Sequence, residues 1–238
     1  MSVLLLRLAG PLQSWGASSR FTRRTTEAMP TKSGILGLLA AAQGRRRSDP
    51  IEDLLDLRLA VRGDQPGVLL RDFHTAHRGN VSMPLSERYY HSDAVFLAAI
   101  EAQGPIVLGL EEALADPAFP IYLGRRSCVP EGRMVLGVFH ENTAGQVLQQ
   151  HPWQAGRAWR RKLKRQATIS LNVQADMGVF PALSATRQLK DVPLSFSPEG
   201  RQYATREVVD CVVDVNNPDH EPQPRGQHDP FSAVRGAQ

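Results

Sequence analysis

Apolar and polar positions divide the first part of the chain into a strand, a loop and a helix. Residues 3–8 form a short apolar run that stops at Gly10, which is typical of a buried strand. Residues 35–42 form a second apolar run, and the hydroxyl of Thr31 or Ser33 can accept a hydrogen bond from an N–H group at its start. Because that run is apolar on most of its faces, we expect a helix packed in the core.

Further periodic segments predict a split βαβ arrangement around a projection. The expected elements are a short helix at 51–57, a half-buried strand at 57–62, a core strand at 93–100, a helix at 106–114, a short strand at 121–123 and a closing strand at 135–139. Residues 77–91 are polar and contain Gly79 and Pro84, which indicates a projecting hairpin or loop. This order of elements is typical of an α+β, ferredoxin-like unit, the architecture of RNA-recognition modules.

The pattern weakens after the closing strand. Residues 202–215 predict a pair of β segments around Arg206, and the last part of the chain is rich in Pro, Gly and Asp. We therefore expect a ferredoxin-like domain at 1–140, a smaller β-rich part at 141–215 and a disordered tail at 216–238.

Composition narrows the class of protein. Cys128 and Cys211 are the only cysteines and lie far apart, which argues against a disulfide framework or a zinc site and fits the reduced cytosol. No apolar stretch approaches the roughly 20 residues that a membrane helix needs. The net charge of +4 is modest, so the placement of the basic residues matters more than their number. We expect a cytoplasmic protein with no metal, cofactor or membrane partner.

The start of the apolar helix has the chemistry of an anion site. Its backbone N–H groups and the helix dipole favour a negative charge, and Lys32 adds a full positive charge between Thr31 and Ser33. The loop that precedes it carries Gln13, Trp15, Arg20, Arg23 and Arg24. The alternative is a plain N-cap with a solvated lysine.

Two further basic segments suit nucleic acid. Arg125 and Arg126 stand in a predicted turn and can fork onto phosphates or stack on bases; an exposed basic turn is the alternative. Residues 157–165 hold six basic residues and no acid, close to Trp153 and Trp159. Aromatic rings that stack on bases and arginines that follow the backbone are typical of single-strand binding, and a solvated helix face over buried tryptophans is the alternative.

Histidines and tyrosines gather in and beside the projection. His74, His77 and His91 lie near Tyr89 and Tyr90 in the sequence. A general base and a general acid beside a 2′-hydroxyl can cleave RNA without a metal, and His and Tyr serve in those roles. The alternative is that these side chains contact a ligand or partner without chemistry. No carboxylate cluster accompanies them, which argues against a metal site.

Four segments carry a family resemblance when they are taken in order. They are LRLAGPLQSWG at 6–16, PTKSGILGLL at 30–39, LRDFHT at 70–75 and YLGRRSC at 122–128, with a weaker match, ATRE, at 204–207. In this combination the chain resembles the CasD family of RAMP-type CRISPR proteins, which are subunits of the type I-E Cascade surveillance complex.

The resemblance implies a non-catalytic subunit that binds the five-prime handle of CRISPR RNA. It implies an RNA-recognition-type domain with a thumb-like hairpin at 74–91. The implied neighbours are the backbone subunit beside the thumb and the large subunit that reads the protospacer-adjacent motif, with target DNA as an indirect partner. The expected RNA-binding residues are Gln13, Trp15, Arg20, Arg23, Arg24, Thr31, Lys32, Ser33, His74, Arg125, Arg126 and Ser127.

A catalytic function is the alternative. A cousin of this subunit in type I-C systems cleaves precursor RNA itself. The second hypothesis is therefore a metal-independent endoribonuclease that uses His74 or His91 with a tyrosine.

Overall fold

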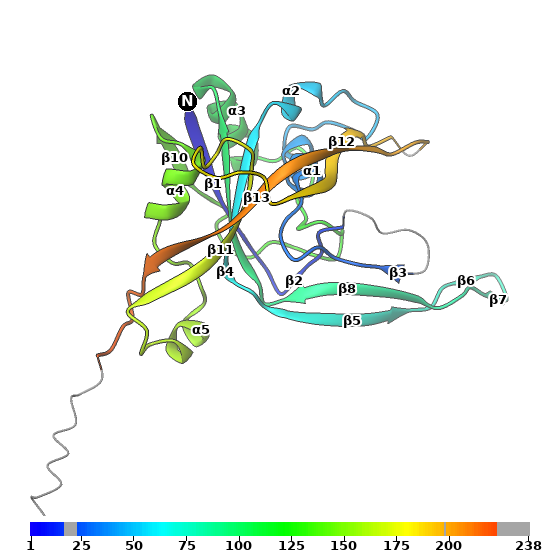
Figure 1. The fold of residues 1–238 in the computed structure, drawn as a ribbon. Helices are drawn as coiled ribbons and strands as arrows, with labels where there is room; N and C mark the ends of the chain where they lie inside the picture. Colours follow the sequence, from blue (N-terminus) through cyan, green and yellow to red (C-terminus); the bar gives the residue numbers. More distant parts are fainter. Residues whose placement is uncertain (17–22, 198, 223–238) are drawn as a thin grey trace, which may run out of the picture.

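An antiparallel seven-stranded sheet forms the centre of the structure, a computed structural model that describes residues 1–16, 23–197 and 199–222 (Figure 1). Its strands follow the order β10-β1-β9-β4-β11-β13-β12. Their bounds are β1 Ser2–Ala9, β4 Arg58–Gln65, β9 Val95–Ala102, β10 Val135–His140, β11 Thr168–Asp176, β12 Arg187–Ser195 and β13 Gln202–Asn216. The helices are α1 Lys32–Ala42, α2 Glu52–Leu55, α3 Gly104–Ala115, α4 Ala144–Gln150 and α5 Arg157–Lys162.

The first half of the chain has the predicted ferredoxin-like arrangement. Strands β10, β1, β9 and β4 are neighbours in that order and all pairs are antiparallel, with α1 following β1 and α3 following β9. The predicted α+β, ferredoxin-like fold is therefore confirmed. The predicted strand at 121–123 is wrong, because these residues run irregularly into a turn closed by the Cys128 carbonyl, which accepts from the Leu123 N–H at 2.7 Å.

The second half of the chain continues the same sheet. Strand β11 pairs with β4 through Ala175 and Ala60, and β13 pairs with β11 along nine residues, from Thr168 to Asp176. Residues 202–215 were expected to be two segments, but β13 is a single strand of 15 residues. It stays continuous because β11 pairs with one of its ends and β12 with the other.

The first residues of the predicted tail pack against the fold. The Asn217 side-chain amide donates to the Leu163 and Gln166 carbonyls at 3.0 and 2.9 Å, and the Glu221 N–H donates to the Lys164 carbonyl. A tail beginning at residue 216 therefore starts too early, and residues 223–238 lie outside the described part.

A long hairpin projects from one end of the sheet (Figure 1). Its arms are β5 Val68–His74 and β8 Ser86–Ser92, and its tip carries β6 His77–Arg78 and β7 Val81–Ser82. The hairpin begins at Val68, whereas the sequence predicted a start at 74. Strand β8 also pairs with β2 Leu12–Gln13 and with β3 Arg23–Arg24, which attaches the projection to the opening loop.

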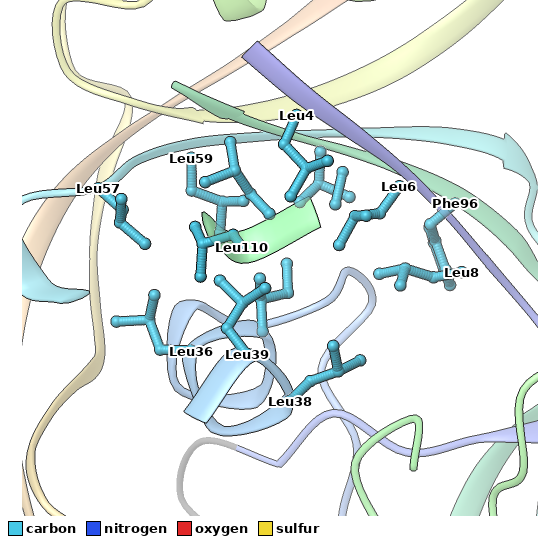
Figure 2. Close-up of a cluster of buried hydrophobic side chains, with 14 of the residues drawn as sticks. Leu4, Leu6, Leu8, Leu36, Leu38, Leu39, Leu57, Leu59, Phe96 and Leu110 are labelled. Atoms are coloured by element: carbon cyan, nitrogen blue, oxygen red, sulfur yellow. The ribbon is translucent and has the colours of Figure 1, made fainter. Parts of the chain in front are cut away.

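The apolar run in β1 reflects cover on both faces of the sheet. One face packs on α1 and α3, and Figure 2 shows the cluster with Leu4, Leu6, Leu8, Leu36, Leu38, Leu39, Leu57, Leu59, Phe96 and Leu110. The opposite face packs Val3 and Leu5 against residues of α4 and against Trp153. A strand covered on both sides reads as continuous apolar sequence because neither side meets water.

Strand β4 is also covered on both faces, and this explains a wrong expectation of half burial. Arg62 is fully buried, and its guanidinium donates to both carboxylate oxygens of Asp64 at 2.7 and 2.8 Å. It also donates to the Leu148 carbonyl and to the His151 carbonyl at 2.9 Å. These bonds attach the segment after α4 to the centre of the sheet.

None of the helices in residues 1–16, 23–197 and 199–222 is long and apolar enough to cross a bilayer.

A glycine pair tests the packing of α1. A Cβ added at Gly34 would lie 2.7 Å from Cε3 of the buried Trp15, whereas one at Gly109 on α3 meets nothing within 4 Å. We expect Gly34→Ala to lower the free energy of unfolding by about 1–3 kcal/mol through overpacking. Gly109→Ala should raise it by about 0.5–1 kcal/mol, because alanine favours a helix interior. Denaturant unfolding measures both, and equal shifts for the two variants would contradict this packing.

Candidate nucleic-acid interface

Two residues of the opening loop are interior rather than surface groups. Gln13 and Trp15 are fully buried. The Gln13 amide donates to the Leu8 carbonyl at 3.0 Å and to the Ala94 carbonyl at 2.8 Å, and its oxygen accepts from the Trp15 indole N–H at 3.1 Å. Every polar group of this pair thus has a partner inside the protein. They fix the path of the loop and offer no surface to RNA.

The start of α1 is occupied by the protein's own carboxylates. Thr31 caps the helix by accepting from the Gly34 N–H at 3.2 Å. The Lys32 N–H donates to Asp191 Oδ2 at 2.7 Å, and Lys32 Nζ donates to Asp176 Oδ2 at 3.0 Å. The sequence predicted an external anion at this helix start, with a solvated lysine as the alternative. In the structure Lys32 is buried and the carboxylates of the protein itself take the place of that anion. Ser33 is buried here as well.

Arg206 completes this buried ion network. Its guanidinium donates to Asp191 at 2.7 and 2.9 Å and also to Asp176. Burial by itself would lower the pKa of Arg206, but the bond to Asp191 and the charges of Asp176 and Asp191 raise it above its ordinary value. The network joins α1 to β11, β12 and β13, and it brings the 30–39 and 204–207 segments of the sequence together.

Exposed cations lie instead along the hairpin. Strand β3 runs parallel to β8, with Arg23 opposite Glu87 and Arg24 opposite Arg88. Arg23 and Arg24 are both exposed, and the Arg23 guanidinium lies 5.5 Å from the centre of the Tyr89 ring. Arg20 lies outside the described residues.

The basic turn is held against the same hairpin. Gly124 has a φ of +92°, and a Cβ there would lie 1.8 Å from the Ser14 carbonyl oxygen, so only glycine fits. The Arg125 guanidinium donates to the Tyr89 carbonyl at 3.2 Å and to the Arg24 carbonyl at 2.7 Å. Arg125 thus connects the turn to both β8 and β3. Arg126 and Ser127 remain exposed beside it.

The hairpin carries charges that sequence reasoning did not single out. Arg71 pairs with Glu87 at 2.5 Å, and this hydrogen bond lowers the pKa of Glu87. His74 contacts Asp72, so its ring already has a carboxylate partner. Arg88 is half-buried, and its Nε finds no hydrogen-bond partner within the described structure. The only sequence feature that could have singled out Arg88 is its position in the polar segment predicted to project.

A family model described as CRISPR-associated protein (Cas_Cas5) matches residues 3–209. The chain belongs to the Cas5 family. The predicted CasD resemblance is thereby confirmed, and a curated relative agrees with it: the CRISPR system Cascade subunit CasD of Escherichia coli (strain K12) is 36% identical over 158 residues, which cover 57% of this chain and 70% of that protein.

Solved structures also resemble this Cas5-family chain. A chain of a structure titled "CRISPR RNA-guided surveillance complex" aligns with a TM-score of 0.74 and 32% identity, covering 98% of this chain and 99% of that one. A second, titled "Crystal structure of Cas protein", aligns with a TM-score of 0.70 and 34% identity, covering 93% and 99%.

This Cas5-family fold does not bring the two candidate catalytic histidines together. His74 lies opposite Ser86 and His91 lies opposite Leu69. Five residues of strand separate them, which is about 17 Å at the usual rise per residue. His91 also contacts the Glu27 carbonyl through Nε2 at 2.7 Å. The two histidines therefore do not serve together as acid and base on one phosphate. Tyr89 lies two residues from His91 on the same face of β8, so the pairing of a histidine with a tyrosine stays a hypothesis. Among the described residues, no group of three or more His, Cys, Asp or Glu is placed to hold a metal.

The ion network of this Cas5-family chain predicts a large difference between two aspartates. Asp191→Ala leaves Arg206 without its bidentate partner and exposes the α1 start, so we expect a loss of about 3–5 kcal/mol in the free energy of unfolding. Asp53→Ala removes the partner of Arg45 at the surface and should cost less than about 1 kcal/mol. Equal losses of unfolding free energy in denaturant would show that the buried network contributes no more to stability than the surface ion pair.

Proposed function

We propose that this chain is a subunit of a CRISPR surveillance complex and binds the five-prime handle of the guide RNA without cleaving it. Family membership and the similarity to the Cascade subunit CasD support this proposal. The observation that carries it is the surface at which Arg125 bonds to both the hairpin and β3. Arg23, Arg24 and Arg126 are exposed there, and Arg23 lies over the Tyr89 ring.

This surface has the chemistry that single-stranded RNA requires. Exposed guanidinium groups pair with phosphates, and an arginine beside a tyrosine ring can also stack on an unpaired base. Ser127 adds a hydroxyl at the rim, and His74 adds a ring on β5. We place Arg20 with them as a prediction, since it belongs to the same loop.

The buried residues of the predicted site have a structural role. Gln13 and Trp15 fix the opening loop, and Thr31, Lys32 and Ser33 fix the start of α1. We propose that they support the RNA-binding surface and do not contact RNA.

Removing three exposed arginines tests the RNA surface. We expect Arg23→Gln, Arg24→Gln and Arg126→Gln together to weaken binding of a handle-containing RNA on the order of tenfold or more and to reduce its dependence on salt, because three phosphate contacts are lost. The control is Arg46→Gln with Arg47→Gln, two exposed arginines after α1. Fluorescence anisotropy across a salt series gives both quantities. An affinity that falls no further than in the control would remove this surface from the proposal.

The hairpin also offers an apolar face to a protein partner. Leu69 is 60% exposed and Phe73 53%, and their spacing of four residues along β5 places both side chains on one face of the strand. Within the described structure, β5 pairs only with β8 and leaves its other edge open. Exposed apolar groups on an open edge strand are typical of a docking site. We propose that the neighbouring backbone subunit docks here, that the large subunit is a second neighbour and that target DNA is reached through the complex.

Polar substitutions on the hairpin test this docking. We expect Leu69→Ser with Phe73→Ser to reduce the amount of this chain that copurifies with the other subunits, while its own RNA affinity stays within about twofold. Ile106→Ser with Leu108→Ser changes two similarly exposed apolar residues on α3 and is the matched control. Full assembly of the hairpin variant would contradict docking at this face.

A further inference from the structure

A second basic surface lies on α5, beside the base of the hairpin. The Gly156 N–H, at the start of α5, donates to Gln65 Oε1 at 3.0 Å. The Gln65 amide donates in turn to Asp93 Oδ2 at 3.0 Å, between the end of β8 and the start of β9. Gln65 therefore ties α5 to the point from which the hairpin leaves. Figure 1 shows both at the same end of the sheet.

The anchoring of α5 turns two arginines outward. Trp159 and Leu163 pack on the second core cluster and define the inner side of this segment. At about 100° per residue, Arg157 and Arg161 lie on the opposite side of the helix. Both are exposed.

The protein neutralises only part of this surface. Arg160 pairs with Asp219 at 3.3 Å, and Lys164 pairs with Glu221 at 2.6 Å. The Lys162 ammonium lies over the Trp159 ring, 5.4 Å from its centre. Within the described ranges no carboxylate pairs with the remaining cations, Arg157, Arg161 and Arg165.

The unpaired cations disfavour the helix that carries them. Arg157 occupies the first turn of α5, where the helix dipole is positive, and no acidic residue stands there to compensate. Arg157 and Arg161 are four residues apart on one face, a spacing at which like charges repel. Arg161 itself lies in the last turn, where the dipole favours a cation. The remaining cost is the charge of Arg157 in the first turn and the repulsion between the two arginines, and a bound anion would offset both.

We propose that the α5 face binds the phosphate backbone of a second stretch of nucleic acid, separate from the stretch at the hairpin. A run of cations with no acid inside it complements a continuous polyanion better than it complements a protein surface of mixed charge. Arginine also matches phosphate through its planar fork of donors. The contacts are to backbone, so binding here does not depend on base sequence.

The test uses the full chain and two probes. Arg157→Gln with Arg161→Gln is compared with Arg46→Gln with Arg47→Gln, which removes the same charge from another surface. Anisotropy is measured against a DNA duplex of arbitrary sequence and against single-stranded RNA, each across a salt series. We expect the α5 variant to bind at least one probe about tenfold more weakly, and the slope of log affinity against log salt to fall by about two. The thermal midpoint should change little, because both side chains are exposed and have no carboxylate partner among the described residues.

Each outcome bears on the proposal. Loss confined to the duplex identifies DNA as the source of the phosphates, and loss confined to the single strand identifies RNA. An unchanged affinity and slope for both probes, or the same loss in the control, overturns the proposal. So does a variant that binds both probes normally but loses another subunit from the assembled complex, because the face would then bind acidic protein. The hairpin arginines are intact in this variant, so the outcome is independent of handle binding.

Discussion

Arg206 connects the two halves of the chain through two buried carboxylates, and the geometry of the opening loop and of the hairpin beside it depends on that connection. Its bonds to Asp191 and Asp176 place a carboxylate on the Lys32 N–H and another on the Lys32 ammonium. The start of α1 is fixed in this way, and Gly34 in its first turn lies directly against Trp15. The neighbouring loop residue is bonded to the hairpin in turn, because the Ser14 hydroxyl donates to the Tyr89 carbonyl at 3.0 Å.

The buried ion network fixes the positions of its residues, whereas its net contribution to stability is small. Removing four charged groups from water costs several kcal/mol each, roughly offset by their mutual attraction. The register of β12 against β13 shifts between Lys190 and Val192, so Asp191 stands at an irregularity of the ladder. Such bulges re-aim a side chain. A slip of β12 by one residue would turn Asp191 to the other face of the sheet, so a carboxylate that must meet both Arg206 and a helix N–H fixes the register.

The apolar pattern was enough to predict the ferredoxin-like half, since its strands are short, apolar and separated by clear turn signals. Strand β11 alternates apolar and polar residues, a pattern that indicates a half-buried strand and could have found it, whereas Pro193 weakens the strand signal of β12. The site was harder: Asp176 and Asp191 lie 144 and 159 residues from Lys32. The residues at the start of α1 predict that an anion binds there. The neighbouring sequence does not distinguish a carboxylate of the same chain from a phosphate of RNA.

Burial and pairing make that distinction, and they sort the basic residues into two classes. Lys32 and Arg206 are buried, each with a carboxylate within hydrogen-bonding distance, so their charge is neutralised inside the protein. Arg126 and Arg161 are exposed and have no acidic partner among the described residues, so their charge acts outward. The modest net charge of +4 does not reveal this division, because it counts buried and exposed residues alike. Part of this outward charge lies on the hairpin side and on α5, which leave the sheet at the same end, so that a long polyanion could contact both (Figure 1).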